Sequence, residues 1–146
     1  FVPVDLTKDS LTDILPASGF DKSSKAFFSW LGVTYYLSEK AICKTLAELS
    51  SLCTGGSGLV FDYPDEGFFN ASERRVQNTV MMAQTGGEPM RSAFSYNELE
   101  RLLNKYGFAI GELLTPDDIQ KRIIDAAGAD IKAFEHVNYC LAVKIK

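Results

Sequence analysis

The chain has 146 residues, of which 46% are apolar and 23% are charged, and this composition is typical of a globular protein with a buried core. Its net charge of −4 gives no support to binding of nucleic acid or of an anionic membrane surface, because both need a basic patch. No apolar run approaches the roughly 20 residues of a membrane-spanning helix. These features predict one domain that binds neither nucleic acid nor membrane.

The cysteines and the histidine argue against a metal site. Cys43, Cys53 and Cys140 are widely spaced without a CxxC pair, and His136 is the only histidine. Three cysteines also indicate reduced thiols rather than a disulfide framework. Together with the lack of a visible signal peptide, this favours a cytoplasmic protein.

The first part of the sequence alternates strands and helices. Its pattern predicts a strand, a helix, a buried strand and a second helix over residues 1–6, 10–17, 25–37 and 38–51. Pro3 makes the first strand an edge or a strand start. Ser10, with Asp13 at the capping-box position, indicates the N-terminus of the first helix, and Ser38 indicates that of the second.

The second part continues this alternation. In chain order, it predicts a strand over 58–63, helices over 72–84 and 95–107, a strand over 108–114, a helix over 115–128 and a last strand over 137–145. Ser95 and Glu98 match a capping box. The glycine-rich residues 54–58 indicate a turn rather than a phosphate-binding loop, because the strand follows the glycines. The alternation predicts an α/β sheet covered on both faces.

Polar and aromatic residues close three of the predicted strands, at the carboxyl ends where ligands of open α/β sheets bind. They are Asp5, the pair Tyr35 and Tyr36, and the pair Asp62 and Tyr63. Asp5 could accept a hydrogen bond from an amine or a ribose hydroxyl, but its spacing favours capping of the next turn or exposure to solvent.

The stretch "FFSWLGVTYYL" holds a single glycine, Gly32, inside an apolar and aromatic run. Two interpretations are open. Gly32 could relieve packing in a buried strand, or it could let a ligand approach the backbone closely.

Six segments, taken in order, resemble the leucine carboxyl methyltransferase-like family of S-adenosylmethionine-dependent enzymes: "FVPVDL", "FFSWLGVTYYL", "LVFDY", "GEPMRSAF", "NELERLLNKYGF" and "CLAVKI". The resemblance covers nearly the whole chain. It implies a Rossmann-like three-layer α/β sandwich with a seven-stranded mixed sheet of order 3-2-1-4-5-7-6, whose last strand is antiparallel. Residues 1–146 would supply only the C-terminal part of this single domain, the third to seventh strands.

The resemblance also implies roles for individual residues. The cofactor S-adenosylmethionine would be bound by Asp5, through the adenine amine, by Leu6, against the adenine ring, and by the cleft residues Ser29, Trp30, Leu31 and Gly32. The acceptor pocket would be faced by Tyr36, Tyr63, Glu88 and Arg91, and Tyr36 or Asp62 would act as the base.

Two departures qualify the resemblance. Many relatives carry a glutamate where this chain has Leu31, and this variant resembles the bacterial branch of uncertain substrate. The family's glycine-rich turn, with the first and second strands, lies upstream of "VPVDL". Residues 1–6 would therefore be displaced, pair with another chain, or need the missing N-terminal part, because an unpaired central strand exposes its edge.

Two functions follow as expectations. The chain could be part of a methyltransferase that acts on a carboxylate or hydroxyl of a small molecule or protein, inactive without its N-terminal part. Alternatively, it is a non-catalytic α/β module that completes its sheet on a partner chain. Binding of the cofactor product once the N-terminal part is restored would distinguish the two.

Overall fold

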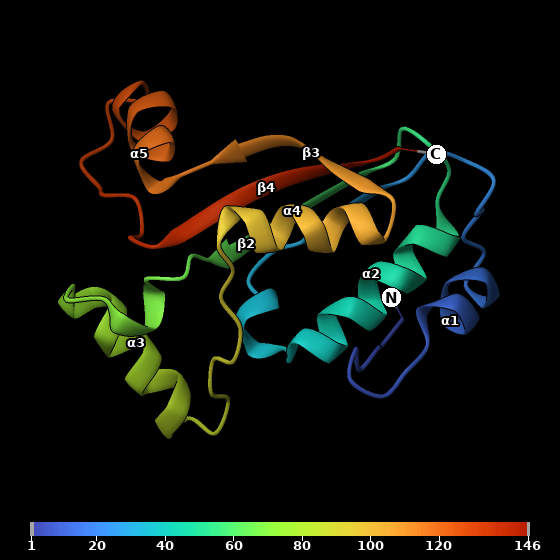
Figure 1. Ribbon diagram of the computed structural model, residues 1–146, viewed down its shortest axis with the longest axis horizontal. Coiled ribbons are helices and arrows are strands. Elements are labelled where there is room, and N and C mark those ends of the chain that lie inside the picture. The colour runs from blue at the N-terminus through green and yellow to red at the C-terminus, as the bar shows by residue number, and fades with distance from the viewer. Residues whose placement is uncertain (1, 146) are drawn as a thin grey trace.

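Four strands form one mixed sheet in the computed structural model, which describes residues 2–145 (Figure 1). Their spatial order is β1-β2-β4-β3. β1 and β2 are parallel, whereas β4 is antiparallel to both of its neighbours. The strands span Phe27–Trp30 (β1), Gly58–Pro64 (β2), Phe108–Leu114 (β3) and Val137–Lys144 (β4). This is the order expected for the fourth, fifth, seventh and sixth strands, so the α/β fold with an antiparallel last strand is confirmed.

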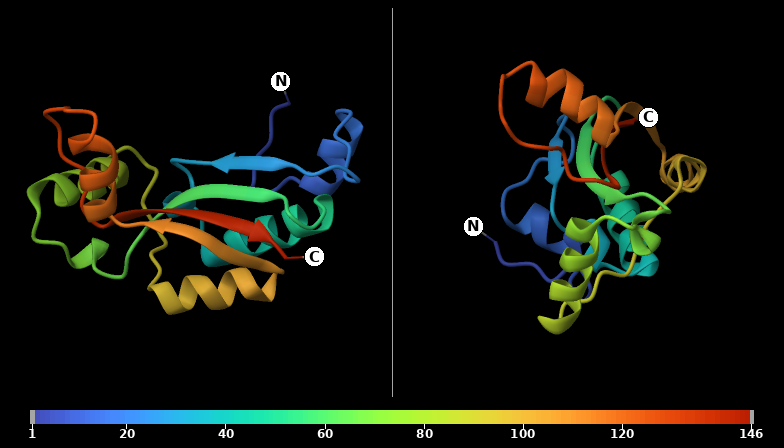
Figure 2. Two further views of the ribbon diagram at one scale, coloured as in Figure 1. Left: turned by 90° about the horizontal axis from the view of Figure 1, so that it is seen from above. Right: turned by 90° about the vertical axis from the view of Figure 1, so that its left-hand side faces the viewer.

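Two helices cover one face of the sheet, α2 (Glu39–Leu52) and α4 (Tyr96–Lys105) (Figures 1 and 2). Both start as predicted: the Ser38 side chain accepts the N–H of the third helical residue, and Ser95 forms a reciprocal capping box with Glu98. Their apolar sides pack on alternate residues of the two central strands. The main core positions are Ile42, Leu46, Leu49, Leu59, Phe61, Leu99, Leu103, Cys140 and Ala142.

The opposite face of the sheet carries no helix over its strands in residues 2–145, as the left view of Figure 2 shows. Phe27 on this face is 68% exposed, and Tyr139 is 38% exposed. The second helical layer of the expected three-layer sandwich is therefore not part of the described residues.

The remaining helices lie outside this layer. α1 (Leu11–Ala17) packs against α2, whereas α3 (Arg74–Thr85) and α5 (Pro116–Ile119) lie beyond the carboxyl ends of β1 and β2 (Figure 1). α5 continues as a π-helical stretch, Gln120–Asp125, and single 3₁₀ turns occupy Thr34–Tyr36 and Phe68–Asn70. No helix of residues 2–145 is both long enough and apolar enough to cross a bilayer.

Two local predictions of strands were wrong, and a third prediction, of a helix cap, was confirmed in position only. Residues 2–5 form no strand, and residues 6–9 form a turn, while Phe1 lies outside the described residues. A strand needs a hydrogen-bonded neighbour, and none of the described residues provides one there. The expected strand over 25–37 spans only Phe27–Trp30. α1 begins at Leu11, directly after Ser10 as predicted, but the Ser10 side chain makes no capping bond.

Candidate active site

The carboxyl ends of β1 and β2 are tied together by one aspartate. Asp62 Oδ1 accepts a hydrogen bond of 2.7 Å from the backbone N–H of Gly32. The main-chain oxygen of Asp62 also accepts a hydrogen bond from the Thr34 hydroxyl. Because β1 and β2 are parallel, both ends lie at the edge of the sheet where α/β proteins bind ligands.

Gly32 sits in an exposed turn and not in a buried strand. Its φ is +73°, and an added Cβ would meet only the Tyr35 hydroxyl, at 3.7 Å. Packing therefore does not explain this glycine, and that interpretation was wrong. The left-handed backbone conformation requires the glycine, and open space lies next to it.

Asp62 is buried, with only 6% of its surface exposed. Burial raises the pKa of this carboxyl group, and hydrogen bonds from backbone N–H groups and from the Tyr35 hydroxyl only partly oppose the rise. Burial and the nearby Asp62 charge also raise the pKa of Tyr35 to about 12. The site thus holds a poorly solvated carboxyl group beside a neutral phenol.

A second segment is attached to the same region by three hydrogen bonds. Arg91 N–H donates to the Tyr35 carbonyl at 2.6 Å, and the Ser92 hydroxyl donates to the Thr34 carbonyl at 2.9 Å. Phe94 N–H donates to the carbonyl of Pro64 at 2.9 Å. These bonds hold residues 91–94 beside the ends of both parallel strands.

Two cavities flank this region. The first, here called the aromatic pocket, has a volume of about 250 Å³ and is lined by Tyr35, Asp62, Phe68, Thr79, Met90, Phe134, Val137 and Tyr139. Its residues come from the turn after β1, the end of β2, α3, and both sides of the start of β4. Apart from Asp62, the lining is apolar, aromatic or hydroxyl-bearing.

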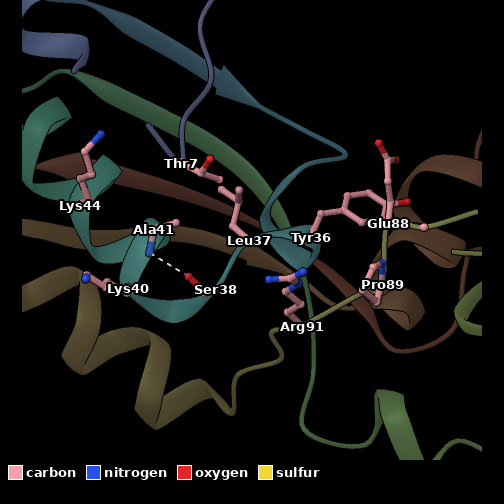
Figure 3. Close-up of a pocket in the computed structure, with 11 residues that line it drawn as sticks. Thr7, Tyr36, Leu37, Ser38, Lys40, Ala41, Lys44, Glu88, Pro89 and Arg91 are labelled. Atoms are coloured by element: carbon pink, nitrogen blue, oxygen red, sulfur yellow. Dashed lines mark hydrogen bonds between the residues drawn. The ribbon is translucent and has the colours of Figure 1, made fainter. Parts of the chain in front are cut away.

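The second cavity, here called the basic groove, has a volume of about 710 Å³ (Figure 3). Thr7, the N-terminal part of α2 and residues 87–91 form its walls. It contains three cations, Lys40, Lys44 and Arg91, and one carboxylate, Glu88. The two cavities therefore differ in charge as well as in size.

The predicted acceptor-facing residues separate into three places. Tyr36, Glu88 and Arg91 lie together in the basic groove, whereas Asp62 lines the aromatic pocket. Tyr63 lines neither cavity. It is 2% exposed in the core, and burial raises its pKa to about 12.

The predicted adenine-binding residues lie near the start of the chain. Asp5 accepts hydrogen bonds from the Thr7 N–H and hydroxyl, at 2.9 and 2.6 Å, and lies 3.0 Å from Lys8 Nζ. The Thr7 bonds and then Lys8 lower the pKa of this exposed carboxyl group to about 2. Leu6 is half-buried against the core. In this structure Asp5 stabilises the turn that follows it.

The predicted cofactor cleft at the end of β1 is partly open. Ser29 and Gly32 are exposed, and Leu31 is 47% exposed. The Trp30 side chain instead points into the core, where its ring centroid lies 6.4 Å from that of Phe61. Only the backbone of Trp30 is therefore free to contact a ligand.

Sequence reasoning missed a polar cluster around His136. Its Nδ1 lies 2.9 Å from Asp65 Oδ1, and its Nε2 lies 3.5 Å from Glu73 Oε2. These contacts connect the loop after β2, the start of α3 and the start of β4. No local motif signals them, because His136 and Asp65 are 71 positions apart. In residues 2–145 no group of three or more His, Cys, Asp and Glu residues, this cluster included, is arranged to hold a metal ion.

Comparison with known sequences gives two matches. The family described as leucine carboxyl methyltransferase matches residues 1–50. The Bacillus subtilis (strain 168) protein YktD, named as a candidate S-adenosyl-L-methionine-dependent methyltransferase, is 43% identical over 146 residues. The match includes 99% of this chain but 48% of YktD, so the chain spans about half the length of this curated relative.

Solved structures share the fold at low sequence identity. A DUF574-family protein from Streptomyces avermitilis superimposes with a TM-score of 0.62 at 17% identity, over 95% of this chain and 50% of that one. Human N-acetylserotonin methyltransferase in complex with SAM gives a TM-score of 0.56 at 12% identity, over 98% of this chain and 33% of that one.

These structural matches show the fold: the chain has the Rossmann-like fold that S-adenosylmethionine-dependent methyltransferases also have. The sequence matches are more specific. They support the leucine carboxyl methyltransferase-like family for this chain.

Proposed function

We propose that this chain is part of an S-adenosylmethionine-dependent methyltransferase that methylates an oxygen nucleophile, either a carboxylate or a hydroxyl. One observation carries the proposal: the buried Asp62 carboxyl group is hydrogen-bonded to Gly32 where the parallel strands β1 and β2 end. A carboxyl group at this edge can orient an acceptor and receive its proton. The methyltransferase-like fold and the family support the same reading.

The residues at the end of β1 suit the cofactor. Ser29, Leu31 and Gly32 are exposed, and the turn has no Cβ at Gly32 to keep a ligand away from the backbone. These residues, the backbone of Trp30, and Asp5 with Leu6 would hold it, with Asp5 accepting from an amine. When bound, S-adenosylmethionine supplies a methyl group attached to a sulfonium. Leu31 adds apolar contact but no acid.

Catalysis would depend mainly on position and desolvation. Asp62 is fixed by the Gly32 N–H and is shielded from water, so it can hold the acceptor in line with the methyl group. Tyr36 in the basic groove is the other possible base. A donor that already carries a positive charge needs little further acid–base assistance.

The length of the relatives supports a further segment that completes the sheet of this chain. The chain spans 48% of YktD and 50% of the S. avermitilis structure. We infer that a segment with two or more strands and a glycine-rich turn completes the sheet beside β1, and that the chain alone is inactive. This segment could belong to the same polypeptide or to a partner.

Calorimetric titration with S-adenosylhomocysteine tests this function. The chain is compared with a longer chain that includes the sequence encoded directly before residue 1. Binding by the longer chain, weakened at least tenfold by Gly32→Ala, supports the enzyme. A folded longer chain that does not bind contradicts it.

The second candidate function is an interaction module without catalysis. The free edge of β1 and the exposed Phe27 beside it favour pairing with another chain. This function predicts that the completed sheet forms but never binds S-adenosylhomocysteine.

A further inference from the structure

The aromatic pocket contains one formal charge, the carboxylate of Asp62. None of its eight lining residues is Lys, Arg or His. Lys40, Lys44 and Arg91 line the basic groove instead. Arg75 lies 4.8 Å from the centre of the Phe134 ring, but it lines neither cavity and is paired with Glu135 at 2.8 Å. An anionic acceptor in the aromatic pocket would therefore face Asp62 without a compensating cation, which is unfavourable in a poorly solvated site.

The size and composition of the pocket limit its ligand. Its volume of about 250 Å³ is below the roughly 300–1,000 Å³ of pockets that hold drug-sized molecules. Phe68, Phe134 and Tyr139 offer aromatic surfaces, and Met90 offers an adaptable thioether. Such walls suit a molecule of one or two rings, and a flexible peptide end would have few backbone partners there.

Asp62 is also the link between this pocket and the proposed cofactor cleft. One of its oxygens is bonded to Gly32 N–H, at the end of the segment Ser29 to Gly32, while the side chain lines the aromatic pocket. A hydroxyl that donates to Asp62 would therefore lie at the border between the pocket and that cleft. No residue of the basic groove has such a link in the described contacts.

We propose that the aromatic pocket binds the methyl acceptor and that this acceptor is a small neutral ring compound carrying a hydroxyl group, such as a phenol. This proposal rests on the proposed function and narrows its acceptor from carboxylate or hydroxyl to hydroxyl. It also assigns Phe68, Phe134 and Tyr139 to acceptor binding, and it leaves the basic groove outside the reaction.

The proposed step is balanced. The acceptor oxygen forms a bond to the methyl carbon while the carbon–sulfur bond breaks, and the electron pair of that bond returns to sulfur. The hydroxyl proton passes to Asp62 and from there to solvent. The products are a methyl ether, neutral S-adenosylhomocysteine and one proton, so no oxidant, reductant or metal is needed.

A matched pair of probes tests the inference by binding alone. 2-Naphthol and 2-naphthoate share one ring system and differ in the charge of the polar group at neutral pH. Their affinities are measured by NMR titration of the protein in its longest folded form, with and without S-adenosylhomocysteine. We expect 2-naphthol to bind at least tenfold more tightly than 2-naphthoate, with shifts at Phe134 and Tyr139.

Three variants locate the site. Asp62→Asn should reduce the preference for 2-naphthol over 2-naphthoate to less than threefold, because it removes the carboxylate charge. Phe134→Ala should weaken 2-naphthol binding about tenfold. Lys40→Ala, in the basic groove, is the matched control and should change neither affinity.

The opposite results overturn the inference. Tighter binding of 2-naphthoate, or loss of binding in Lys40→Ala, would place the acceptor in the basic groove. Absence of 2-naphthol binding by a protein that binds S-adenosylhomocysteine would reject the aromatic pocket but keep the enzyme. Conversely, the protein could bind 2-naphthol in an Asp62-dependent way without binding S-adenosylhomocysteine. That result would contradict the methyltransferase function but support the aromatic pocket as a binding site for neutral ring compounds.

Discussion

At the scale of single residues, substitution of Gly32 can distinguish a role in cofactor binding from a loss of stability caused by backbone strain alone. Gly32→Ala places a Cβ on a residue with φ +73° but with no atom closer than the Tyr35 hydroxyl at 3.7 Å. We expect a loss of about 1 kcal/mol in the free energy of unfolding, from the left-handed conformation alone. Urea denaturation measures this loss.

Gly19 is the matched control for this substitution. Its φ is +89°, nothing lies within 4 Å of an added Cβ, and it lies far along the chain from the strand ends. Gly19→Ala should therefore cost a similar amount of stability and leave S-adenosylhomocysteine binding unchanged. Equal effects of the two variants on binding would show that Gly32 has no special relation to the cofactor.

His136 makes part of the stability depend on pH. Burial lowers its pKa, but hydrogen bonds and charges from Asp65 and Glu73 outweigh burial, and the net pKa is raised. The protonated ring therefore stabilises the folded state fully below the unfolded pKa of about 6.5, and this contribution is lost as the pH rises through the folded-state pKa. We expect wild type to lose stability relative to His136→Asn over this interval.

Thermal unfolding of both proteins at several pH values, from about 6 to about 8, measures the difference. Asparagine is chosen because His136 has φ +61°, which asparagine tolerates better than most residues. Asp65→Asn in the wild-type background should reduce the same pH dependence. A constant difference between wild type and His136→Asn would mean that the imidazole does not titrate in this interval.

How much of the site could be predicted depends on strand geometry. Asp62 was singled out because it lies near the end of a buried apolar run, and the structure places it in a cavity at that end of β2, while its role stays a prediction. Tyr63 could not share that cavity, since adjacent strand residues point to opposite faces of the sheet. His136 was missed for a different reason: its partners are brought to it by tertiary folding and leave no local pattern.

At the scale of whole elements, two helix starts show what a capping pattern alone can predict. Ser10 with Asp13 and Ser95 with Glu98 have the same spacing, yet only Ser95 caps its helix. The Ser10 hydroxyl instead pairs with Thr12 Oγ1 at 2.7 Å. Local spacing identifies where a helix begins, but the conformation of the preceding segment decides whether the side chain reaches the backbone.

Substitution of the two serines measures this difference. Ser95→Ala should lower the free energy of unfolding by about 1 kcal/mol, because the Ser95 hydroxyl no longer accepts the Glu98 N–H or donates to the Glu98 carboxylate. Ser10→Ala, the matched control, should change it by a few tenths of a kcal/mol at most. If urea denaturation gives equal losses for Ser95→Ala and Ser10→Ala, the capping box of α4 adds no more stability than a serine that makes no cap.

Element boundaries were predicted best where pattern and packing agree. β3 and β4 follow their apolar pattern closely, and α2 begins at its predicted cap. The run over 25–37 was divided because the positive φ of Gly32 and the 3₁₀ turn Thr34–Tyr36 end the strand early. Residues 2–5 have strand-like composition, but composition alone does not supply a pairing partner.

At the scale of the whole molecule, the two edge strands of the sheet are built differently. β3 has a register irregularity between Ile110 and Glu112, and Glu112 pairs with Arg122 at 2.7 Å. Bulges and charges are the features that protect a permanent edge. β1 has neither feature: it reads Phe-Phe-Ser-Trp, and its register with β2 is regular.

This asymmetry predicts which edge another segment covers. If a further segment completes the sheet beside β1, the outward-facing amides of Phe27–Trp30 should exchange hydrogen rapidly in the chain alone and at least 100-fold more slowly in the completed protein. The outward amides of β3 provide the internal control, because the expected strand order leaves that edge free in both forms. Amide exchange followed by NMR or mass spectrometry measures both edges in one sample. Protection of β3 without protection of β1 would contradict the proposed completion, because β1 would then be the permanent edge despite lacking the charge and the irregularity that protect such strands.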